Sequence, residues 1–287
     1  PLIIPNDSQQ YTPDAARNRA FVDKIEPGST AKIFSMLYAL ENTEYKDDNS
    51  ISIGDGSLTV DKHTIHDVHA KDNKILFSDI LKLSSNVAIS KLALDFPITS
   101  YINKLNDFGL GESTAIGFPG EVFGGIGHYN IKQGSFDQAA LSYGYGMSLS
   151  VLQLGRAYLR IANNDSMKQV FLINDNHHDS NEHHPLVSDA AIKRLVAMME
   201  KVTQKGGTGY RANIGKIKVA GKTGTAYISN SNGYSENFIS SFAGFAPSLD
   251  PHYVVVVVLW EPNYANHFGG KSAAPIFANV MKHLLVF

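Results

Sequence analysis

Apolar residues recur at helical spacing in several stretches before residue 205, and polar or glycine-rich segments separate these stretches. In Thr30–Glu41, for example, Ile33, Leu37 and Leu40 fall on one face of a helix that begins close to Ser29. Residues 42–72 are predicted to form loops and weak strands, and residues 111–134 a glycine-rich loop. Further helices are predicted over Pro13–Phe21 with Thr12 as N-cap, Phe77–Leu83, Val87–Phe96, Ser100–Phe108, Val151–Ala162 and Asp189–Gln204.

The pattern changes after the glycine pair at 206–207. Segments rich in Val, Ile, Phe and Tyr follow, joined by polar turns, and they predict an antiparallel meander of Lys216–Ile228, Asn237–Ala246 and Tyr253–Trp260. Ala273–Val286 then resumes the helical spacing. Helices on both sides of a late antiparallel sheet, without an internal repeat or a linker, predict one α+β domain over residues 1–287.

The composition narrows the class of protein. With 43% apolar and 18% charged residues, the 287-residue chain can bury a sizeable core, which argues against intrinsic disorder. Lys and Arg number 25 and Asp and Glu 27, so the net charge of −2 provides no basic field for nucleic acid. No cysteine is present, so a nucleophile must be an oxygen or an amine.

Ser29 and Lys32 are the first candidates for chemistry. Residues three apart on a helix share one face, so a hydroxyl and an amine would meet there. A serine needs a base to act as a nucleophile, and a lysine can be that base if burial lowers its pKa from about 10.4 toward about 7–8. Taken alone, the pair is better explained as a helix cap and a solvated lysine.

Two later segments carry similar groups. Ser84 and Asn86 lie in the predicted turn between two helices, where the hydroxyl could pass a proton and the amide could hold a substrate amide. The segment Lys222-Thr223-Gly224-Thr225 lies inside a predicted strand, where a cation and two hydroxyls suit a carboxylate and the glycine permits close approach of another backbone. In isolation, helix capping and a strand bulge are the simpler explanations of these two segments.

Taken in order, Ser-x-x-Lys, Ser-x-Asn and Lys-Thr-Gly are the motif set of penicillin-binding proteins and class A β-lactamases. The chain resembles the class B high-molecular-weight penicillin-binding proteins more closely, and most of all the division-specific transpeptidases of Gram-negative bacteria. The resemblance covers almost the whole chain and includes Arg17-Asn18-Arg19, Glu26-Pro27-Gly28-Ser29-Thr30-Ala31-Lys32, Leu83-Ser84-Ser85-Asn86-Val87, Ser90-Lys91-Leu92-Ala93, Phe108-Gly109-Leu110-Gly111, Pro119-Gly120-Glu121, Ser142-Tyr143-Gly144-Tyr145-Gly146, Gln153-Leu154, Gly269-Gly270 and Ala274-Pro275-Ile276-Phe277.

This resemblance implies the penicillin-binding protein and serine β-lactamase fold, and a peptidoglycan D,D-transpeptidase of septal cell-wall synthesis that is acylated by β-lactams. Ser29 would attack the D-Ala-D-Ala carbonyl of a stem peptide while Lys32 takes its proton, and the amine of a second stem peptide would resolve the acyl-enzyme. Ser84 would relay a proton to the departing D-Ala, and Asn86 would position the substrate amide. Neither a cofactor nor a metal is implied.

The resemblance also assigns the strand segment. Lys222, Thr223 and Thr225, with Gly224 between them, would bind the terminal carboxylate of the substrate or tune the charge around Ser84 and Lys32. The backbone N–H groups of Ser29 and Thr225 would form the oxyanion hole.

Other functions share this acylation chemistry. A D,D-carboxypeptidase or a β-lactamase would differ only in resolving the acyl-enzyme with water, and no Glu-x-x-Leu-Asn stretch like that of class A β-lactamases lies between Asn86 and Lys222. A β-lactam sensor would be acylated without turnover. The absence of that stretch disfavours a β-lactamase, whereas the three motifs do not separate a carboxypeptidase or a sensor from a transpeptidase.

The chain departs from the family in two respects. Class B enzymes carry a membrane anchor and a pedestal domain before the catalytic domain, whereas the longest strongly apolar run here, Tyr253–Trp260, is far shorter than the roughly 20 residues of a spanning helix. We therefore expect a soluble, N-terminally truncated catalytic part of a protein anchored at the periplasmic face of the inner membrane, with divisome partners. Two strands of the family's five-stranded sheet precede the nucleophile, but only Leu2–Ile4 is strand-like there.

Histidines gather in two polar segments, and imidazole is a common metal ligand. They lack the carboxylate–histidine spacing that would fix a coordination geometry, so the sequence predicts solvated loops and no metal site for His63, His66, His69, His177, His178, His183 and His184.

Overall fold

The largest sheet is antiparallel and has the order β7-β8-β9, from strands β7 (Ala220–Asn230), β8 (Gly233–Ala246) and β9 (Tyr253–Trp260). The structure, a computed structural model, describes residues 17–68, 72–127, 131–172, 183–230 and 233–285. In the central strand β8, every residue from 239 to 246 is buried, because strands flank it and helices cover the sheet. The predicted meander is confirmed, although β7 begins at Ala220 rather than at Lys216.

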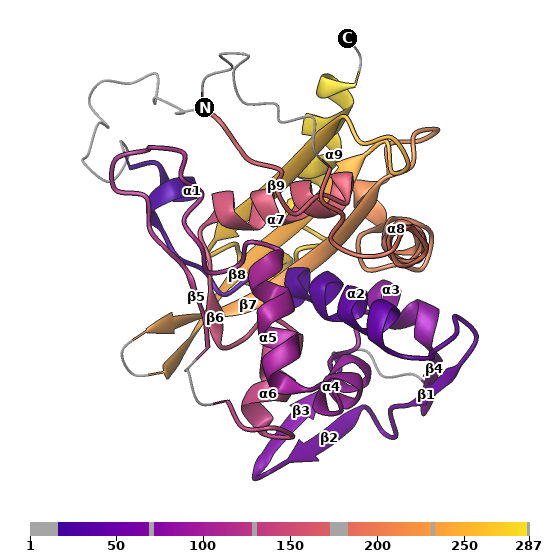
Figure 1. Ribbon diagram of the computed structural model, residues 1–287. Helices are drawn as coiled ribbons and strands as arrows, with labels where there is room; N and C mark the ends of the chain where they lie inside the picture. The colour runs from indigo at the N-terminus through magenta and orange to yellow at the C-terminus, as the bar shows by residue number, and fades with distance from the viewer. Residues whose placement is uncertain (1–16, 69–71, 128–130, 173–182, 231–232, 286–287) are drawn as a thin grey trace.

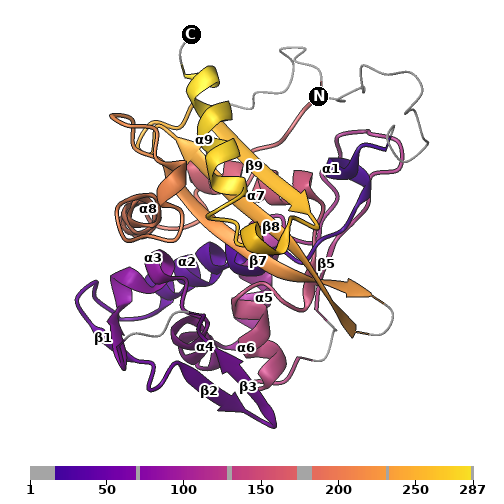
Figure 2. The same ribbon diagram turned by 180° about the vertical axis from the view of Figure 1, so that it is seen from behind.

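Helices cover both faces of this sheet. Helix α7 (Val151–Asn163) packs on one face and α9 (Ala273–Leu284) on the other, as the two opposite views show, while α8 (Asp189–Thr203) lies beside β7 (Figures 1 and 2). Helix α7 begins with a capping box in which the side chains of Ser150 and Gln153 each accept the other residue's backbone N–H. These helices match the predicted ones to within about two residues, and the arrangement is the predicted α+β fold.

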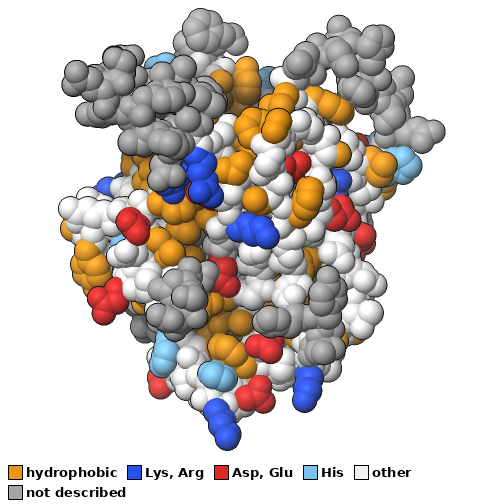
Figure 3. Space-filling model, turned by 90° about the vertical axis from the view of Figure 1, so that its left-hand side faces the viewer, with side chains coloured by type: hydrophobic (Ala, Val, Ile, Leu, Met, Phe, Trp, Pro, Cys, Tyr) orange, Lys and Arg blue, Asp and Glu red, His pale blue; other side chains and the backbone are white. Residues whose placement is uncertain are grey.

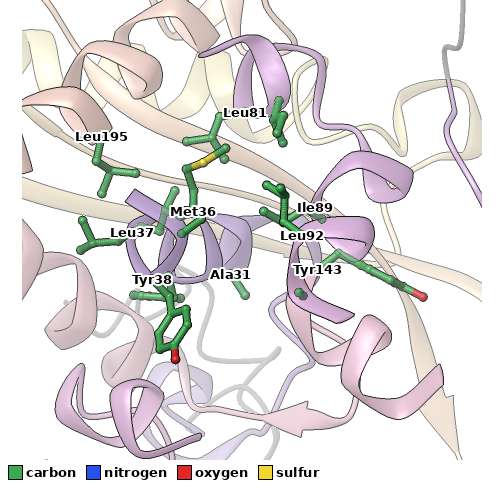
Figure 4. Close-up of a cluster of buried hydrophobic side chains, with 14 of the residues drawn as sticks. Ala31, Met36, Leu37, Tyr38, Leu81, Ile89, Leu92, Tyr143 and Leu195 are labelled. Carbon is green, nitrogen blue, oxygen red and sulfur yellow. The ribbon is translucent and has the colours of Figure 1, made fainter. Parts of the chain in front are cut away.

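Helix α2 (Lys32–Asn42) forms the centre of the core. Every residue from 32 to 40 is buried, because α8, α3 (Ile80–Leu83) and α4 (Asn86–Leu94) surround it. Figure 4 shows Met36 and Leu37 of this helix among Leu81, Leu92 and Leu195 from those neighbours. A helix enclosed by apolar side chains on all sides holds its position rigidly, which matters because α2 also carries a candidate catalytic side chain.

A second region lies below α2 in Figure 1 and is built from helices and short hairpins. It contains α4, α5 (Ile98–Asp107) and α6 (Phe136–Ser142), with the antiparallel pairs β1 (Ser50–Ser52) with β4 (Lys74–Leu76) and β2 (Ser57–Val60) with β3 (His63–His66). The short pair β5 (Gly125–Ile126) and β6 (Met147–Ser148) lies closer to the sheet. In the described part of residues 42–72, which leaves out 69–71, the predicted loops and weak strands are confirmed, although Asn42 is the last residue of α2.

Some predictions need correction. Helix α6 was not predicted, because it is only two turns long and follows a glycine-rich stretch; it forms because Ser135 caps it and Ala139 and Leu141 are buried. The first described helix, α1 (Arg19–Val22), is short and capped by Asn18, so the predicted helix from Pro13 does not continue through Phe21; residues 12–16 lie outside the described residues.

The expected five-stranded sheet has three strands within the described residues. Leu2–Ile4, the strand-like run before the nucleophile, lies outside them. On the face shown in Figure 3, acidic and basic side chains are interspersed, in keeping with the net charge of −2. Among the described residues, no helix combines the length and the apolarity needed to cross a membrane.

Candidate active site

Ser29 lies in a 3-10 turn, Gly28–Ala31, that leads directly into α2. The N–H of Gly28, whose φ is +52°, donates to the carbonyl of Gly144 at 3.1 Å. A Cβ on Gly144 would lie 2.1 Å from the carbonyl oxygen of Gly28, so only glycine fits there. From the other side, the hydroxyl of Tyr158 donates to the carbonyl of Thr30 at 2.8 Å. The turn that carries Ser29 is therefore fixed from both sides, at the predicted helix start.

Lys32 is fully buried at the first position of α2, and its Nζ is surrounded by oxygen atoms. It lies 3.0 Å from Ser29 Oγ and 3.1 Å from Ser84 Oγ. It donates at 2.6 Å to the backbone carbonyl of Ser84 and at 2.6 Å to Oδ1 of Asn86. The predicted meeting of the Ser29 hydroxyl with the Lys32 amine is confirmed, and the alternative of a solvated lysine is wrong.

The environment of Lys32 favours its neutral form. Burial lowers the pKa of the Lys32 ammonium from its ordinary value to about 7, because the charged form loses its hydration, while the nearby carboxylate of Asp67 acts in the opposite direction. A lysine with a pKa near neutrality has a substantial fraction of free amine under physiological conditions. Lys32 therefore meets the chemical requirement for a base beside Ser29.

The segment from Ser84 to Asn86 is the tight turn between α3 and α4, as predicted. Ser84 caps α3 in the left-handed conformation, with φ of +58°, which is costly for a residue other than glycine and concentrates at functional sites. Ser85 caps α4 by accepting the N–H of Ala88 at 2.9 Å. This sharp reversal places both the carbonyl and the hydroxyl of Ser84 against Lys32.

Lys222 reaches the same place from strand β7. Its side chain is fully buried, and its Nζ donates to Ser84 Oγ at 2.8 Å and to the carbonyl of Thr223 at 3.1 Å. Burial lowers the pKa of Lys222 well below its ordinary value, and the neighbouring positive charge of Lys32 lowers it further. The hydroxyl of Ser84 thus lies between the amines of Lys32 and Lys222, which come from opposite sides of the site.

The rest of the predicted strand segment lies beside the nucleophile turn. A Cβ on Gly224 would lie 2.9 Å from Cγ2 of Thr30 and 3.1 Å from the carbonyl oxygen of Pro27, so the absence of a side chain lets β7 and the turn approach closely. Thr225 Oγ1 accepts the N–H of Gly269 at 3.1 Å. Ser29 and Thr225, whose N–H groups are the expected oxyanion hole, therefore belong to two adjoining segments.

Two residues of this site were not identified from the sequence. Asp67, at the end of the β2–β3 hairpin, accepts hydrogen bonds from the turn between α3 and α4, and Thr208 accepts one from Thr223 Oγ1 at 3.0 Å. Neither residue belongs to a local motif, because Asp67 is 19 positions from Asn86 and Thr208 is 15 positions from Thr223. Only folding brings these partners together.

No group of three or more His, Asp or Glu side chains able to hold a metal ion occurs within the described residues. His63 and His66 lie on strand β3, and His183 and His184 precede α8. His69, His177 and His178 lie outside the described residues.

This geometry agrees with comparisons to known proteins. Residues 4–282 match the family model described as the penicillin binding protein transpeptidase domain. The chain belongs to this family. The structure is similar to the apo structure of the TP domain from Burkholderia pseudomallei penicillin-binding protein 3, with a TM-score of 0.85 at 31% identity over 94% of this chain and 82% of that one. The fold expected from the resemblance is confirmed.

Curated relatives point the same way. The chain is 36% identical to the peptidoglycan D,D-transpeptidase FtsI of Buchnera aphidicola, over 99% of this chain and 50% of the relative. It is 33% identical to the probable peptidoglycan D,D-transpeptidase PbpC of Pseudomonas aeruginosa, over 98% of this chain and 49% of the relative. The resemblance to the division-specific transpeptidases is confirmed. The chain spans about half the length of these relatives.

Proposed function

We propose that this chain is a serine-type peptidoglycan D,D-transpeptidase that cross-links stem peptides through an acyl-enzyme on Ser29. The observation that carries the proposal is the set of contacts at the buried amine of Lys32, 3.0 Å from the Ser29 hydroxyl. The names of the relatives and the family match support the substrate class.

The contacts of Lys32 explain how it acts as the base. A neutral amine has two N–H donors and one lone pair. The short contacts to the Ser84 carbonyl and to Asn86 Oδ1, both 2.6 Å, occupy the two donors. The lone pair is then free to accept the proton of the Ser29 hydroxyl as its Oγ attacks the carbonyl carbon of the penultimate D-Ala.

Ser84 completes the first half of the reaction. Once Lys32 has become an ammonium, its third N–H donates to Ser84 Oγ, which also accepts from Lys222. As the C–N bond breaks, Ser84 gives its own proton to the amine of the departing D-Ala and takes the proton of Lys32 in return. The acyl group remains on Ser29 as an ester. The amine of a second stem peptide then attacks this ester and gives a proton to the neutral Lys32. Lys32 returns that proton to Ser29 Oγ as the ester C–O bond breaks and the new amide bond remains.

The remaining predicted residues bind the substrate in this proposal. Asn86 positions the substrate amide, while Lys222, Thr223 and Thr225 bind the terminal carboxylate, and the missing side chain of Gly224 keeps the strand close to Ser29. The N–H groups of Ser29 and Thr225 stabilise the tetrahedral oxyanion, where a single donor contributes about 3–4 kcal/mol. We place this activity in septal wall synthesis, with divisome partners, at the periplasmic face of the inner membrane.

Intact-mass measurement during incubation with benzylpenicillin tests the acylation. We expect an adduct of one drug molecule that persists for many minutes and that is lost in Ser29→Ala. Rapid release of hydrolysed drug would indicate a β-lactamase instead, and a chain that forms no adduct would contradict the serine mechanism.

A second assay separates transfer from hydrolysis. The chain is given a stem-peptide donor that ends in D-Ala-D-Ala, together with a D-amino acid as acceptor amine. A transpeptidase forms the new amide at a rate that rises with acceptor concentration, whereas a carboxypeptidase releases the free acid regardless of acceptor. A chain that is acylated by the drug but neither transfers nor hydrolyses the stem peptide would be a sensor.

A further inference from the structure

Asp67 lies outside the three motifs, yet its carboxylate contacts the catalytic turn at several points. Its Oδ1 accepts the backbone N–H of Asn86 at 2.5 Å and that of Val87 at 3.0 Å, and its Oδ2 accepts the hydroxyl of Ser85 at 2.6 Å. The first N–H groups of a helix have no partner within the helix, so these bonds satisfy the start of α4 from a distant part of the chain. The negative charge also suits the positive end of the helix dipole.

His66, the residue before Asp67, also binds Asn86. The carbonyl of His66 accepts the Nδ2 N–H of Asn86 at 2.9 Å. With its amide nitrogen bound there, Asn86 turns its Oδ1 toward Lys32 Nζ, at 2.6 Å. The end of strand β3 thus fixes both the backbone and the side-chain orientation of Asn86.

We propose that Asp67 is a positioning residue for acylation, which holds the Ser84–Asn86 turn against Lys32 and keeps a negative charge close to that amine. The inference rests on the proposed function, because it concerns the same acylation of Ser29.

The charge and the hydrogen bonds of Asp67 have separable effects. Through its charge, Asp67 raises the pKa of Lys32 and so works against burial, which lowers it. Loss of the charge therefore lowers the pKa of Lys32 and increases the fraction of free amine. Loss of the hydrogen bonds loosens the turn and slows acylation at every pH. The two effects on the rate have opposite signs below neutrality.

Other charged groups around Lys32 are few among the described residues that contact it. Lys222 approaches from β7, and Ser29, Ser84 and Asn86 are uncharged. The pKa of the exposed Asp55 is lowered mainly by the hydrogen bonds it accepts from Ser57, with a smaller contribution from His66. A shift in the pH profile on removal of Asp67 therefore reports the loss of its own carboxylate.

The test measures the second-order rate of acylation by benzylpenicillin from pH 5.5 to 9 for matched variants. Asp67→Asn keeps an oxygen that can accept the Asn86 and Val87 N–H groups but loses the charge, so the rise of the rate should move to lower pH with a modest fall in the plateau. Asp67→Ala should show the same shift with a plateau about 10–100-fold lower, the size expected for a small misplacement of catalytic groups. Ser85→Ala removes the hydrogen bond to Asp67 and the cap on the Ala88 N–H but no charge, so only its plateau should fall.

Asp55→Asn is the matched control, because Asp55 lies in the turn just before β2, is exposed, and accepts from the N–H and hydroxyl of Ser57. It should leave both the plateau and the pH profile unchanged. A pH profile of Asp67→Asn that coincides with the native one would overturn the electrostatic role, and an unchanged plateau in Asp67→Ala would overturn the positioning role. If Asp67→Ala does not fold, the pH profile of Asp67→Asn tests the electrostatic role and the plateau of Ser85→Ala tests the positioning role. Absence of acylation in the native chain would instead contradict the proposed function.

Discussion

The two walls of the site are built in different ways. The helix wall, which we define as Ser29, Lys32, Ser84 and Asn86, is held by side-chain hydrogen bonds that converge on one buried amine. The strand wall, which we define as Lys222–Thr225 of β7, also contains one buried amine, that of Lys222. Its position against the nucleophile turn depends on the close backbone approach at Gly224. The geometry of the helix wall therefore depends on specific polar atoms and their charges, whereas that of most of the strand wall depends on close packing without a side chain at Gly224.

This difference predicts different kinds of failure. A change in the helix wall should lower the rate of acylation and leave the fold intact, because these groups lie at or against the start of α2, which the core already fixes. A change in the strand wall should disturb geometry and stability together, because an added atom must displace a neighbouring chain segment. The following variants test this contrast.

Lys32→Met should give the largest effect on the rate of acylation. Methionine fills a similar volume without an amine, and the loss of a general base typically costs about 10²–10⁴-fold. Stopped-flow acylation by benzylpenicillin measures the rate, and circular dichroism checks the fold. Lys91→Met is the matched control, since its Nζ donates to the Ser52 carbonyl away from the site, and it should acylate normally. Normal acylation of Lys32→Met would remove Lys32 as the base.

Gly224→Ala tests the strand wall. The new Cβ would lie 2.2 Å from Ser241 Oγ and 2.9 Å from Thr30 Cγ2, so the nucleophile turn must move. We expect acylation to fall about 10²-fold, the size of a 1 Å misplacement, and stability to fall by about 1–3 kcal/mol in urea unfolding.

Gly125→Ala is the control for that variant, because a Cβ there has no atom within 4 Å, and it should change neither measurement. If Gly224→Ala lost activity with unchanged stability, the proposed contrast between the walls would be wrong.

The pH dependence of the native chain tests the helix wall alone. Lys32 must be neutral to accept the Ser29 proton, and its pKa is about 7. The rate of acylation should therefore fall about tenfold per pH unit below that value and level off above it, because the neutral fraction falls in that proportion. A rate that stays constant between pH 5.5 and 8 would contradict this assignment.

Thr208→Val should give the smallest effect. It removes the acceptor of the Thr223 hydroxyl but keeps the volume of the side chain, and one neutral hydrogen bond contributes about 0.5–1.5 kcal/mol. We expect a loss of severalfold or less in the rate with a carboxylate-bearing β-lactam, and no change in the pH profile. A loss as large as that of Gly224→Ala would show that the strand wall also depends on side-chain bonds.

The sequence by itself determined the parts whose information is local. Helical spacing predicted α2 and α8, and strand composition predicted β9 to the residue. Ser29 and Lys32 are separated by one helical turn, so their meeting followed from geometry within a single element. The order of the three motifs was sufficient to recognise the family. Helical spacing could not predict α6, because a two-turn helix gives too few repeats of the pattern.

The tertiary structure decided everything that depends on contacts between distant segments. The pKa of Lys32 follows from its complete burial beside Ser84 and Asn86 of the distant turn between α3 and α4, which no local pattern encodes. Ser84 lies between two amines only because β7 packs opposite the turn that carries it. Asp67 gained its position through the β2–β3 hairpin, and its partners are 18 or more residues away in the sequence. Local periodicity specifies which side chains share one face of a helix or strand. The burial of those side chains, and their contacts with distant segments, depend on how the whole chain packs.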